Sequence, residues 1–244
     1  MHKQTQMIDI HSHVIYGADD GARTLEESIQ LLQKAQTEGA GAVIATPHYK
    51  PQQTDSQSAE IREKADKLRE ALTKQNIKLP LYTGNEVLYF DSLTEHLRRG
   101  WVLCLADSAY VLIEFYPKDS WQKMLQAARK IRNAGYLPVF AHVERYAALR
   151  EHDVRELIAN GAYLQINVSS LEGGWFNQQA NFCKKLIRQN CIHFLGSDMH
   201  RIDTRPPKLM AGLTWLLAHD ANAEALFSKN ASYILENKEL PLEQ

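Results

Sequence analysis

The fold of this chain is constrained most by a regular alternation of short apolar runs with longer amphipathic segments. Each run holds four or five residues rich in Val, Ile, Leu or aromatic side chains, which is typical of a buried parallel strand. Seven such strands are predicted, and they cover residues 7–10, 42–45, 79–83, 110–113, 137–141, 162–166 and 193–196.

Helices are predicted between these strands. Thr24 and Glu27 form a capping-box pattern at the start of a helix that Gly39 ends. Further helices are expected near residues 57–75, 120–134, 152–160 and 177–190. Gly135 and Gly161 follow two of them, as expected for glycines just after a helix end. Strand–helix alternation of this kind indicates an α/β fold with parallel strands and right-handed crossovers.

Two parallel architectures fit this alternation, an open doubly wound sheet and a closed barrel. An open sheet would usually carry a glycine-rich phosphate loop after its first strand, and the sequence has none there. Seven strands spaced by about 30 residues favour a barrel somewhat short of the eight-stranded TIM form. We expect residues 1–244 to form a single domain.

Composition excludes several classes of protein. The net charge of -1 argues against a general nucleic-acid binder. No apolar run approaches the ~18 residues of a membrane helix, and the N-terminal residues lack the apolar stretch of a secretory signal. Three scattered cysteines do not make a disulfide framework. These features predict a soluble, cytoplasmic protein with no membrane insertion.

Histidines and carboxylates follow the predicted strands at the points where the strands end. Because the carboxyl ends of barrel strands meet at one rim, these side chains are expected to converge on one basin. The set contains His11, His13, His48, Glu86, Glu114, His142, Asp198 and His200, with Asp20 reaching the basin from the first loop.

Taken singly, most of these residues have an ordinary structural explanation. Taken together, crowded imidazoles and carboxylates are normally paired or bound to metal. The His-x-His pattern of His11 and His13 places both rings on one side of a strand. A donor set without thiolate suits Mn²⁺, Fe or Zn²⁺, and it is large enough for two or three ions with one bridging carboxylate.

The succession of motifs HSH, DDG, TPH, NE, IEF, AHVERY and SDMH, followed by Arg205-Pro206-Pro207, resembles the PHP (polymerase and histidinol phosphatase) superfamily. It is most similar to the manganese-dependent bacterial protein-tyrosine phosphatases linked to capsule and exopolysaccharide synthesis. The resemblance runs in order from about Met7 to Pro207. It implies a distorted TIM-like (β/α)7 barrel, the PHP fold, with three divalent ions, expected to be Mn²⁺.

The resemblance also implies which residues hold each ion. The first ion would be held by His11, His13, Glu86 and Asp198; the second by Glu86, Glu114 and His142; the third by Asp20, His48 and His200. The implied reaction is attack of a metal-activated hydroxide on a phosphomonoester. The implied partner is a phosphotyrosine protein, expected to be a bacterial tyrosine autokinase.

Three further residues are expected at the site. Arg145 and Arg205 directly follow two ligand motifs, where guanidinium groups could bind phosphoryl oxygens in bidentate fashion. Asp9 precedes His11 by two residues on the same strand face and could orient a ligand imidazole. Four ligand carboxylates with three divalent ions would leave a positive surplus that suits a phosphate dianion.

Alternative functions stay open at this point. A Cys-x5-Arg phosphatase motif is absent, because Tyr110, Gln189 and Ser197 stand six residues after the three cysteines. The alternatives are a small-molecule phosphoesterase, such as a histidinol phosphatase, and a non-catalytic metal-bound regulatory module. Aromatic residues in the predicted rim loops could stack on a substrate phenyl ring or simply pack: Tyr16, Phe115, Tyr116, Tyr146 and Trp175.

Overall fold

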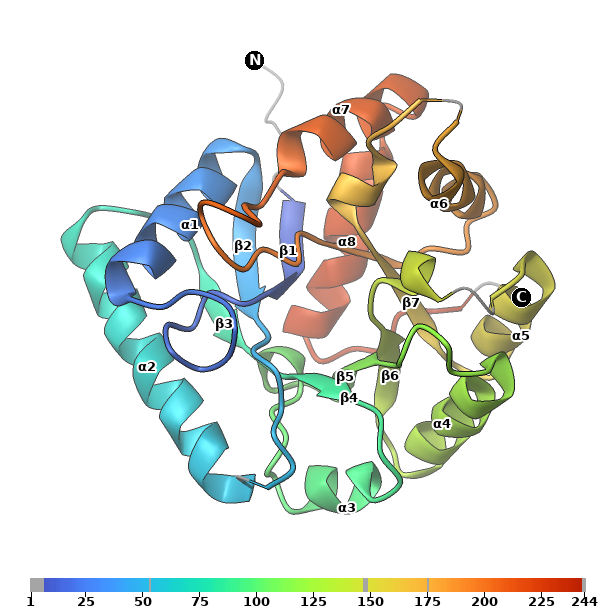
Figure 1. Cartoon of the computed structure of the whole chain (residues 1–244), viewed down its shortest axis with the longest axis horizontal. Coiled ribbons are helices and arrows are strands. Elements are labelled where there is room, and N and C mark those ends of the chain that lie inside the picture. The colour runs from blue at the N-terminus through green and yellow to red at the C-terminus, as the bar shows by residue number, and fades with distance from the viewer. Residues whose placement is uncertain (1–6, 53, 147–148, 175, 243–244) are drawn as a thin grey trace.

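A computed structural model describes residues 7–242 except 53, 147–148 and 175. The described residues contain eight strands, all paired in parallel, in the orders β1-β2-β3 and β4-β5-β6-β7-β8. Their bounds are β1 Met7–Ser12, β2 Ala40–Ala45, β3 Leu81–Thr83, β4 Glu86–Leu88, β5 Tyr110–Glu114, β6 Leu137–Phe140, β7 Tyr163–Asn167 and β8 Phe194–Gly196. Figure 1 shows these strands in the middle of the molecule.

Two isolated bridges join the sheets into a barrel. Ser12 pairs with Met199, which connects β1 to the segment after β8, and His48 pairs with Glu86, which connects the segment after β2 to β4. The α/β barrel predicted from the sequence is therefore confirmed. The strand count differs from the seven predicted. The third predicted strand, residues 79–83, corresponds to β3, and β4 is an additional strand that Gly84 and Asn85 separate from β3.

Asn85 gives the physical reason for this division. Its side-chain amide donates to the carbonyl of Pro47 and its side-chain oxygen accepts from the amide of Leu103. A Cβ at Gly84 would lie 2.8 Å from Leu105 Cδ2 and 3.2 Å from Leu105 Cα, so a side chain at this close approach would displace Leu105.

Helices surround the strands (Figure 1). Their bounds are α1 Leu25–Thr37, α2 Thr54–Lys74, α3 Leu93–Arg98, α4 Trp121–Asn133, α5 Glu151–Ala159, α6 Gln178–Arg188, α7 Leu209–His219 and α8 Ala223–Leu235. Gly135 and Gly161 have φ values of +89° and +85° just after α4 and α5, as the sequence predicts. In the described part of the chain, none of the helices combines the length and apolar character of a membrane span.

The capping of α1 agrees with the sequence pattern except at one hydrogen bond. Thr24 Oγ1 accepts from the amide of Glu27, as predicted. The Glu27 carboxylate accepts from the amide of Arg23 rather than that of Thr24. In a standard capping box the Glu27 carboxylate would accept from the amide of the N-cap residue, Thr24. Here it accepts from the amide one residue earlier in the chain.

The segment after α8 closes the amino-terminal end of the barrel. Tyr110 and Tyr163 are the first residues of β5 and β7, and both are fully buried. The Tyr110 hydroxyl donates to the carbonyl of Lys238 and accepts from the amide of Leu240, while the Tyr163 hydroxyl donates to the carbonyl of Leu240. This end is thus sealed by hydrogen bonds within the chain, which leaves the opposite end for the predicted ligands.

Candidate metal centre

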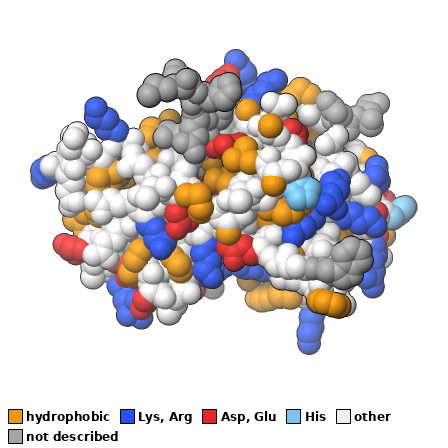
Figure 2. All heavy atoms as spheres, turned by 90° about the horizontal axis from the view of Figure 1, so that it is seen from above, with side chains coloured by type: hydrophobic (Ala, Val, Ile, Leu, Met, Phe, Trp, Pro, Cys, Tyr) orange, Lys and Arg blue, Asp and Glu red, His pale blue; other side chains and the backbone are white. Residues whose placement is uncertain are grey.

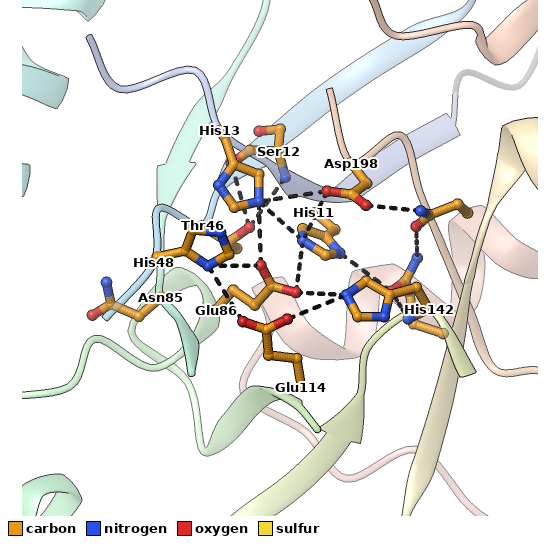
Figure 3. A network of polar contacts seen from close by, with 12 residues as sticks. His11, Ser12, His13, Thr46, His48, Asn85, Glu86, Glu114, His142 and Asp198 are labelled. Atoms are coloured by element: carbon orange, nitrogen blue, oxygen red, sulfur yellow. Dashed lines mark hydrogen bonds and ion pairs between the residues drawn. The ribbon is translucent and has the colours of Figure 1, made fainter. Parts of the chain in front are cut away.

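The structure brings the nine predicted ligand residues together at the carboxyl ends of the strands. Figure 3 shows how they lie, except for Asp20 and His200. They come from β1 or the loop after it, from the segments after β2, β6 and β8, and from β4 and β5. Most are buried, but Asp20, His48 and Glu114 have side chains that are 69%, 34% and 22% exposed. The cluster therefore extends from the barrel interior to its surface.

Three groups of donor atoms within this cluster lie close enough to share a cation. The first contains His11, His13 and Asp198; the second contains His48, Glu86 and Glu114; the third contains His13, Asp20, His48 and His200. These groups overlap with the sets that the family resemblance implies. They differ in that His48 joins Glu86 and Glu114, while His142 Nε2 lies 2.9 Å from Glu86 Oε1 and 3.8 Å from Glu114 Oε2.

Hydrogen bonds fix which nitrogen of three histidines faces the cluster. The Nδ1 atom of His13 lies 2.7 Å from Asp19 Oδ2, and that of His11 lies 3.3 Å from Gln165 Oε1. His200 Nδ1 lies 2.9 Å from the carbonyl oxygen of Asp198. Since all three partners are acceptors, each Nδ1 carries the proton and each Nε2 presents a lone pair, as a metal ligand must.

These lone pairs point at each other and at carboxylates. His11 Nε2 lies 3.2 Å from His13 Nε2, and it lies 3.3 Å from Glu86 Oε1 and 3.5 Å from Asp198 Oδ1. Acceptors facing acceptors at these distances repel unless positive charge lies between them. The buried Nδ1 of His142 also has no hydrogen-bond partner among the described residues. The donor set therefore fits divalent cations.

The pKa values of the metal-free cluster also indicate that its carboxylates are stabilised by positive charge on their neighbours. Burial lowers the pKa of His13, but its contacts with Asp19 and Glu86 outweigh burial and raise that pKa to about 10. Burial opposes ionisation of Glu86, yet the imidazoles of His11, His13 and His142 hold its pKa well below the usual value. Without metal, protons on the imidazoles supply the charge that the carboxylates require.

Arg145 and Arg205 both point at this cluster. Arg145 Nη2 lies 2.6 Å from Asp198 Oδ2, and Arg205 Nη2 contacts the same oxygen atom. Their side chains remain 37% and 38% exposed. Two guanidinium groups therefore border the cluster on its solvent side, with donors available to an anion.

Asp9 has a different role from the one predicted. Its Oδ1 accepts hydrogen bonds from the backbone amides of His11 and Ser197, and its Oδ2 has no partner among the described residues. Among the described residues it makes no hydrogen bond to a ligand imidazole, and the ring of His11 faces Gln165 instead. Asp9 instead ties β1 to the segment after β8, and burial raises its pKa to about 6.

The residues that do orient the ligands were not predicted as such. Gln165 Oε1 faces His11 Nδ1 and accepts from the amide of His142 at 2.8 Å, and its Nε2 donates to Asn167 Oδ1. Asn167 Nδ2 in turn donates to Asp198 Oδ2. The two-residue spacing of Gln165 and Asn167 on β7 is the signal that places both on the site's side of the strand.

Gly196 makes room for this arrangement. A Cβ at this position would lie 2.6 Å from His11 Cβ and 2.9 Å from Gln165 Nε2. Any side chain here would displace the ring of a predicted ligand.

The rim aromatics divide into packing residues and exposed ones. Phe115 and Tyr146 are 2% exposed and contact each other, and the Tyr146 hydroxyl accepts from the amide of Phe115. These two are packing residues. Tyr116 is 59% exposed and Tyr16 is half-buried, whereas Trp175 lies outside the described residues.

Comparison of the sequence with known proteins gives a matching family and relatives named as tyrosine-protein phosphatases. The family model for capsular polysaccharide synthesis, CpsB/CapC, matches residues 7–236. Tyrosine-protein phosphatase CpsB of Streptococcus agalactiae is 34% identical over 241 residues, which cover 95% of this chain and 99% of the relative. Tyrosine-protein phosphatase YwqE of Bacillus subtilis is 34% identical over 237 residues, which cover 95% of this chain and 92% of the relative.

Solved structures agree with the fold. A structure from a crystallographic study of YwqE from Bacillus subtilis and CpsB from Streptococcus pneumoniae, described as metal-dependent tyrosine phosphatases, superimposes with a TM-score of 0.88. It is 32% identical in sequence, and the match covers 97% of both chains. The phosphotriesterase homology protein from Escherichia coli, 12% identical, has a TM-score of 0.60 over 96% of this chain and 99% of that one. This second likeness bears on the fold alone.

The chain is a parallel barrel with imidazole and carboxylate donors at the carboxyl ends of its strands. This arrangement is typical of metal-dependent hydrolases built on barrel folds. Within that class, this chain belongs to the CpsB/CapC family of capsular polysaccharide synthesis.

Proposed function

We propose that this chain is a metal-dependent protein-tyrosine phosphatase that hydrolyses a phosphotyrosine protein in capsule or exopolysaccharide synthesis. The observation that carries the proposal is the convergence of nine imidazole and carboxylate side chains beside two arginines. Carboxylates alone would repel a phosphate dianion. Cations held by this donor set, together with the two guanidinium groups, make the same basin attractive to it.

Three divalent ions are proposed, with Mn²⁺ as the native metal and Fe or Zn²⁺ as alternatives. His11, His13, Glu86 and Asp198 would hold the first ion; Glu86, Glu114 and His142 the second; Asp20, His48 and His200 the third. When bound, the ions would lower the pKa of a water molecule and neutralise charge on the phosphoryl group. The lone pairs that His11 and His13 turn toward Glu86 and Asp198 support this assignment.

The chain's own residues position the reaction. Arg145 and Arg205 would donate hydrogen bonds to phosphoryl oxygens while retaining contact with Asp198. Asp19 keeps the proton on His13 Nδ1, and Gln165 does the same for His11, so that neither ring can rotate its lone pair out of the site. The oxygen of water bonds to phosphorus, the bond from phosphorus to the phenolic oxygen breaks, and the products are tyrosine and inorganic phosphate.

Tyrosine selection is proposed to involve the exposed aromatics of the rim. Tyr116 follows Glu114 by two residues and is 59% exposed, so its ring is available to a substrate phenyl group. Phe115, the residue before it, is buried and packs against Tyr146 with ring centroids 5.9 Å apart. An exposed aromatic ring is suited to edge or face contact with another aromatic ring.

The proposed partner is a bacterial tyrosine autokinase, since a phosphotyrosine protein must be made by a tyrosine kinase. The names of the curated relatives and the capsular family model support this context. A cytoplasmic location and a single catalytic domain over residues 1–244 complete the proposal.

The decisive test is phosphate release by purified, metal-stripped protein with and without added Mn²⁺. A phosphotyrosyl peptide and histidinol phosphate are compared as substrates, and binding of each is measured in parallel. Metal-dependent release that favours the peptide is the expected result. Preference for histidinol phosphate would replace the tyrosine assignment with a small-molecule phosphoesterase, and peptide binding without turnover would favour a regulatory module.

A further inference from the structure

A second cavity lies at the opposite end of the barrel from the candidate metal centre. Its volume is about 530 Å³, and its lining comes from α6, α7, α8 and the segment just before β8. His193 in this lining precedes β8, and Asp198 follows β8. At about 3.3 Å per residue, the strand separates the two by ~16 Å. The cavity is therefore distinct from the site of the proposed reaction.

The cavity combines apolar walls with cations. Ile192, Leu216 and Phe227 line it and are buried. Arg188 and Lys229 also line it, and neither has a carboxylate partner among the described residues. By contrast, Arg132 nearby is paired with Glu239 at 2.5 Å. Unpaired cations beside an apolar wall are suited to a ligand with an apolar body and a negative group.

Asp220 is the single acidic residue among the described lining residues. Its Oδ1 accepts a hydrogen bond from the backbone amide of Asn222 at 2.8 Å. This carboxylate therefore has a role in the turn between α7 and α8 and leaves the cavity with a net positive charge.

The buried side chain of His193 adds a hydrogen-bond donor to the cavity. His193 is 8% exposed and its Nδ1 accepts from the amide of Leu164 at 3.0 Å, while Asn230 Nδ2 donates to its carbonyl oxygen. The proton of the neutral ring is therefore on Nε2, which has no hydrogen-bond partner among the described residues. Burial lowers the pKa of His193 to about 4, so the ring is neutral at pH 7 and Nε2 is a donor.

Trp215 holds one of the cations in place. The Arg188 guanidinium lies 5.7 Å and the Lys184 ammonium 5.3 Å from the indole ring, and His219 stacks on the indole with centroids 4.0 Å apart. Figure 2, viewed from the side where α6 and α7 lie in Figure 1, shows Lys and Arg side chains gathered beside a histidine. A guanidinium held by an indole ring loses little freedom when it binds an anion.

We propose that this cavity is a second binding site, separate from the phosphatase centre, for a small planar aromatic anion. The aromatic body packs against Phe227 and Trp215, the negative group contacts Arg188 and Lys229, and His193 Nε2 donates to an acceptor on the ligand. The volume fits a molecule of one or two fused rings, because ligand cavities of this kind span ~300–1,000 Å³.

The test uses 2-naphthalenesulfonate as the probe and 2-naphthalenesulfonamide as its neutral counterpart. Binding of each to the full chain is measured by calorimetry, and quenching of tryptophan fluorescence is followed in parallel. We expect one molecule of the sulfonate to bind per chain, and the neutral sulfonamide to bind at least about 10-fold more weakly.

The double variant Arg188→Gln/Lys229→Gln removes both cations from the cavity. It should weaken sulfonate binding at least about 10-fold and leave sulfonamide binding unchanged. The matched control, Lys67→Gln/Arg99→Gln, removes two exposed cations from α2 and the end of α3 and should bind as the parent does. Circular dichroism verifies that each variant is folded.

Binding at the phosphatase centre is separated by a third variant, Arg145→Gln/Arg205→Gln, which should retain full sulfonate affinity. Loss of affinity in that variant would place the probe at the metal centre and overturn the proposal. Equal affinity in the Arg188/Lys229 variant, equal affinity for the neutral sulfonamide, or no binding at about 1 mM probe would overturn it as well.

Discussion

At the amino-terminal ends of the strands, the hydroxyls of Tyr110 and Tyr163 are satisfied by the backbone of residues 238–240. At the carboxyl ends, imidazole lone pairs and carboxylates face one another, and buried atoms of Asp9, His142 and Glu144 lack partners among the described residues. One set of strands thus carries an end where residues 238–240 satisfy the buried tyrosine hydroxyls and an end that requires cations. Contacts at the first end stabilise the fold, whereas the second end carries the candidate metal ligands.

Backbone conformation follows the same division. Both His142 and Asp198, two of the predicted ligands, have positive φ values of +34° and +55°. Non-glycine residues rarely adopt such angles, and they persist where surrounding hydrogen bonds over-determine them. Gln165 accepts from the amide of His142, and the amide of Asp198 donates to the carbonyl of His11. The strained backbone therefore turns these side chains into the cluster.

The largest effect should come from removing a ligand at the cation-requiring end. Asp198→Ala should lower kcat/KM at least ~100-fold, because loss of a direct ligand exceeds the 10–100-fold cost of losing an outer partner. Metal content and phosphate release are both measured. The control, Asp203→Ala, removes an exposed carboxylate five residues away, and similar losses in both variants would contradict the assignment.

A smaller effect is expected when only the orienting amide is removed. Gln165→Met should weaken metal affinity about 10–100-fold, since His11 loses the acceptor that fixes its ring. Affinity is measured by competition with a chelator. Gln36→Met serves as the control, since this partly exposed amide on α1 donates to the carbonyl of Lys78, away from the metal centre. Unchanged affinity in the Gln165 variant would show that the ring is fixed by packing alone.

The end closed by residues 238–240 should respond in stability and not in catalysis. Tyr110→Phe leaves the amide of Leu240 without its acceptor, which should lower the free energy of unfolding by about 1–3 kcal/mol. Urea unfolding measures this loss, while kcat/KM and metal affinity should stay at the parent values. Tyr82→Phe is the control, because the Tyr82 hydroxyl makes no hydrogen bond with the described residues. A catalytic loss in the Tyr110 variant would show that the two ends are coupled.

The smallest expected effect is the pH dependence of stability in the metal-free protein, which tests whether protons replace the cations. In the metal-free protein, the pKa of His13 is raised to about 10 from an ordinary value near 6.5. Its protonation therefore stabilises the fold fully below about pH 6.5, and this contribution is lost as pH rises toward 10. We expect a loss of at least about 1 kcal/mol between pH 7 and 10, or about 2–4 °C in Tm for a chain of this size.

Metal-loaded protein is the control for this titration, since bound cations replace the protons. Its Tm should fall less over the same pH range. Equal pH dependence in the stripped and loaded proteins would mean that the imidazoles do not carry the charge that balances Glu86.

Much of the architecture could be predicted because it depends on local patterns. Strand periodicity, the Thr24 cap and the glycines after α4 and α5 are each set by a few neighbouring residues. The direction of parallel strands then places every strand-end side chain at one rim. For that reason nine ligand candidates and two arginines could be named before their distances were known.

Other features depend on partners far apart in the chain. The sequence predicts that Asp9 contacts an imidazole, because strand alternation gives a side but not a distance. In the structure its carboxylate accepts from the backbone amides of His11 and Ser197 instead. Gln165 meets His11 across 154 residues, and Tyr110 meets Leu240 across 130. The second cavity likewise arises where α6, α7 and α8 pack around His193.

The sequence by itself therefore determined the barrel, the rim and the chemical character of the donor set, since these follow from periodicity and strand direction. The tertiary structure decided which nitrogen each imidazole turns inward, which residues hold it there and where a second cavity forms. Those outcomes depend on angstrom-scale register between distant segments, which no local pattern encodes.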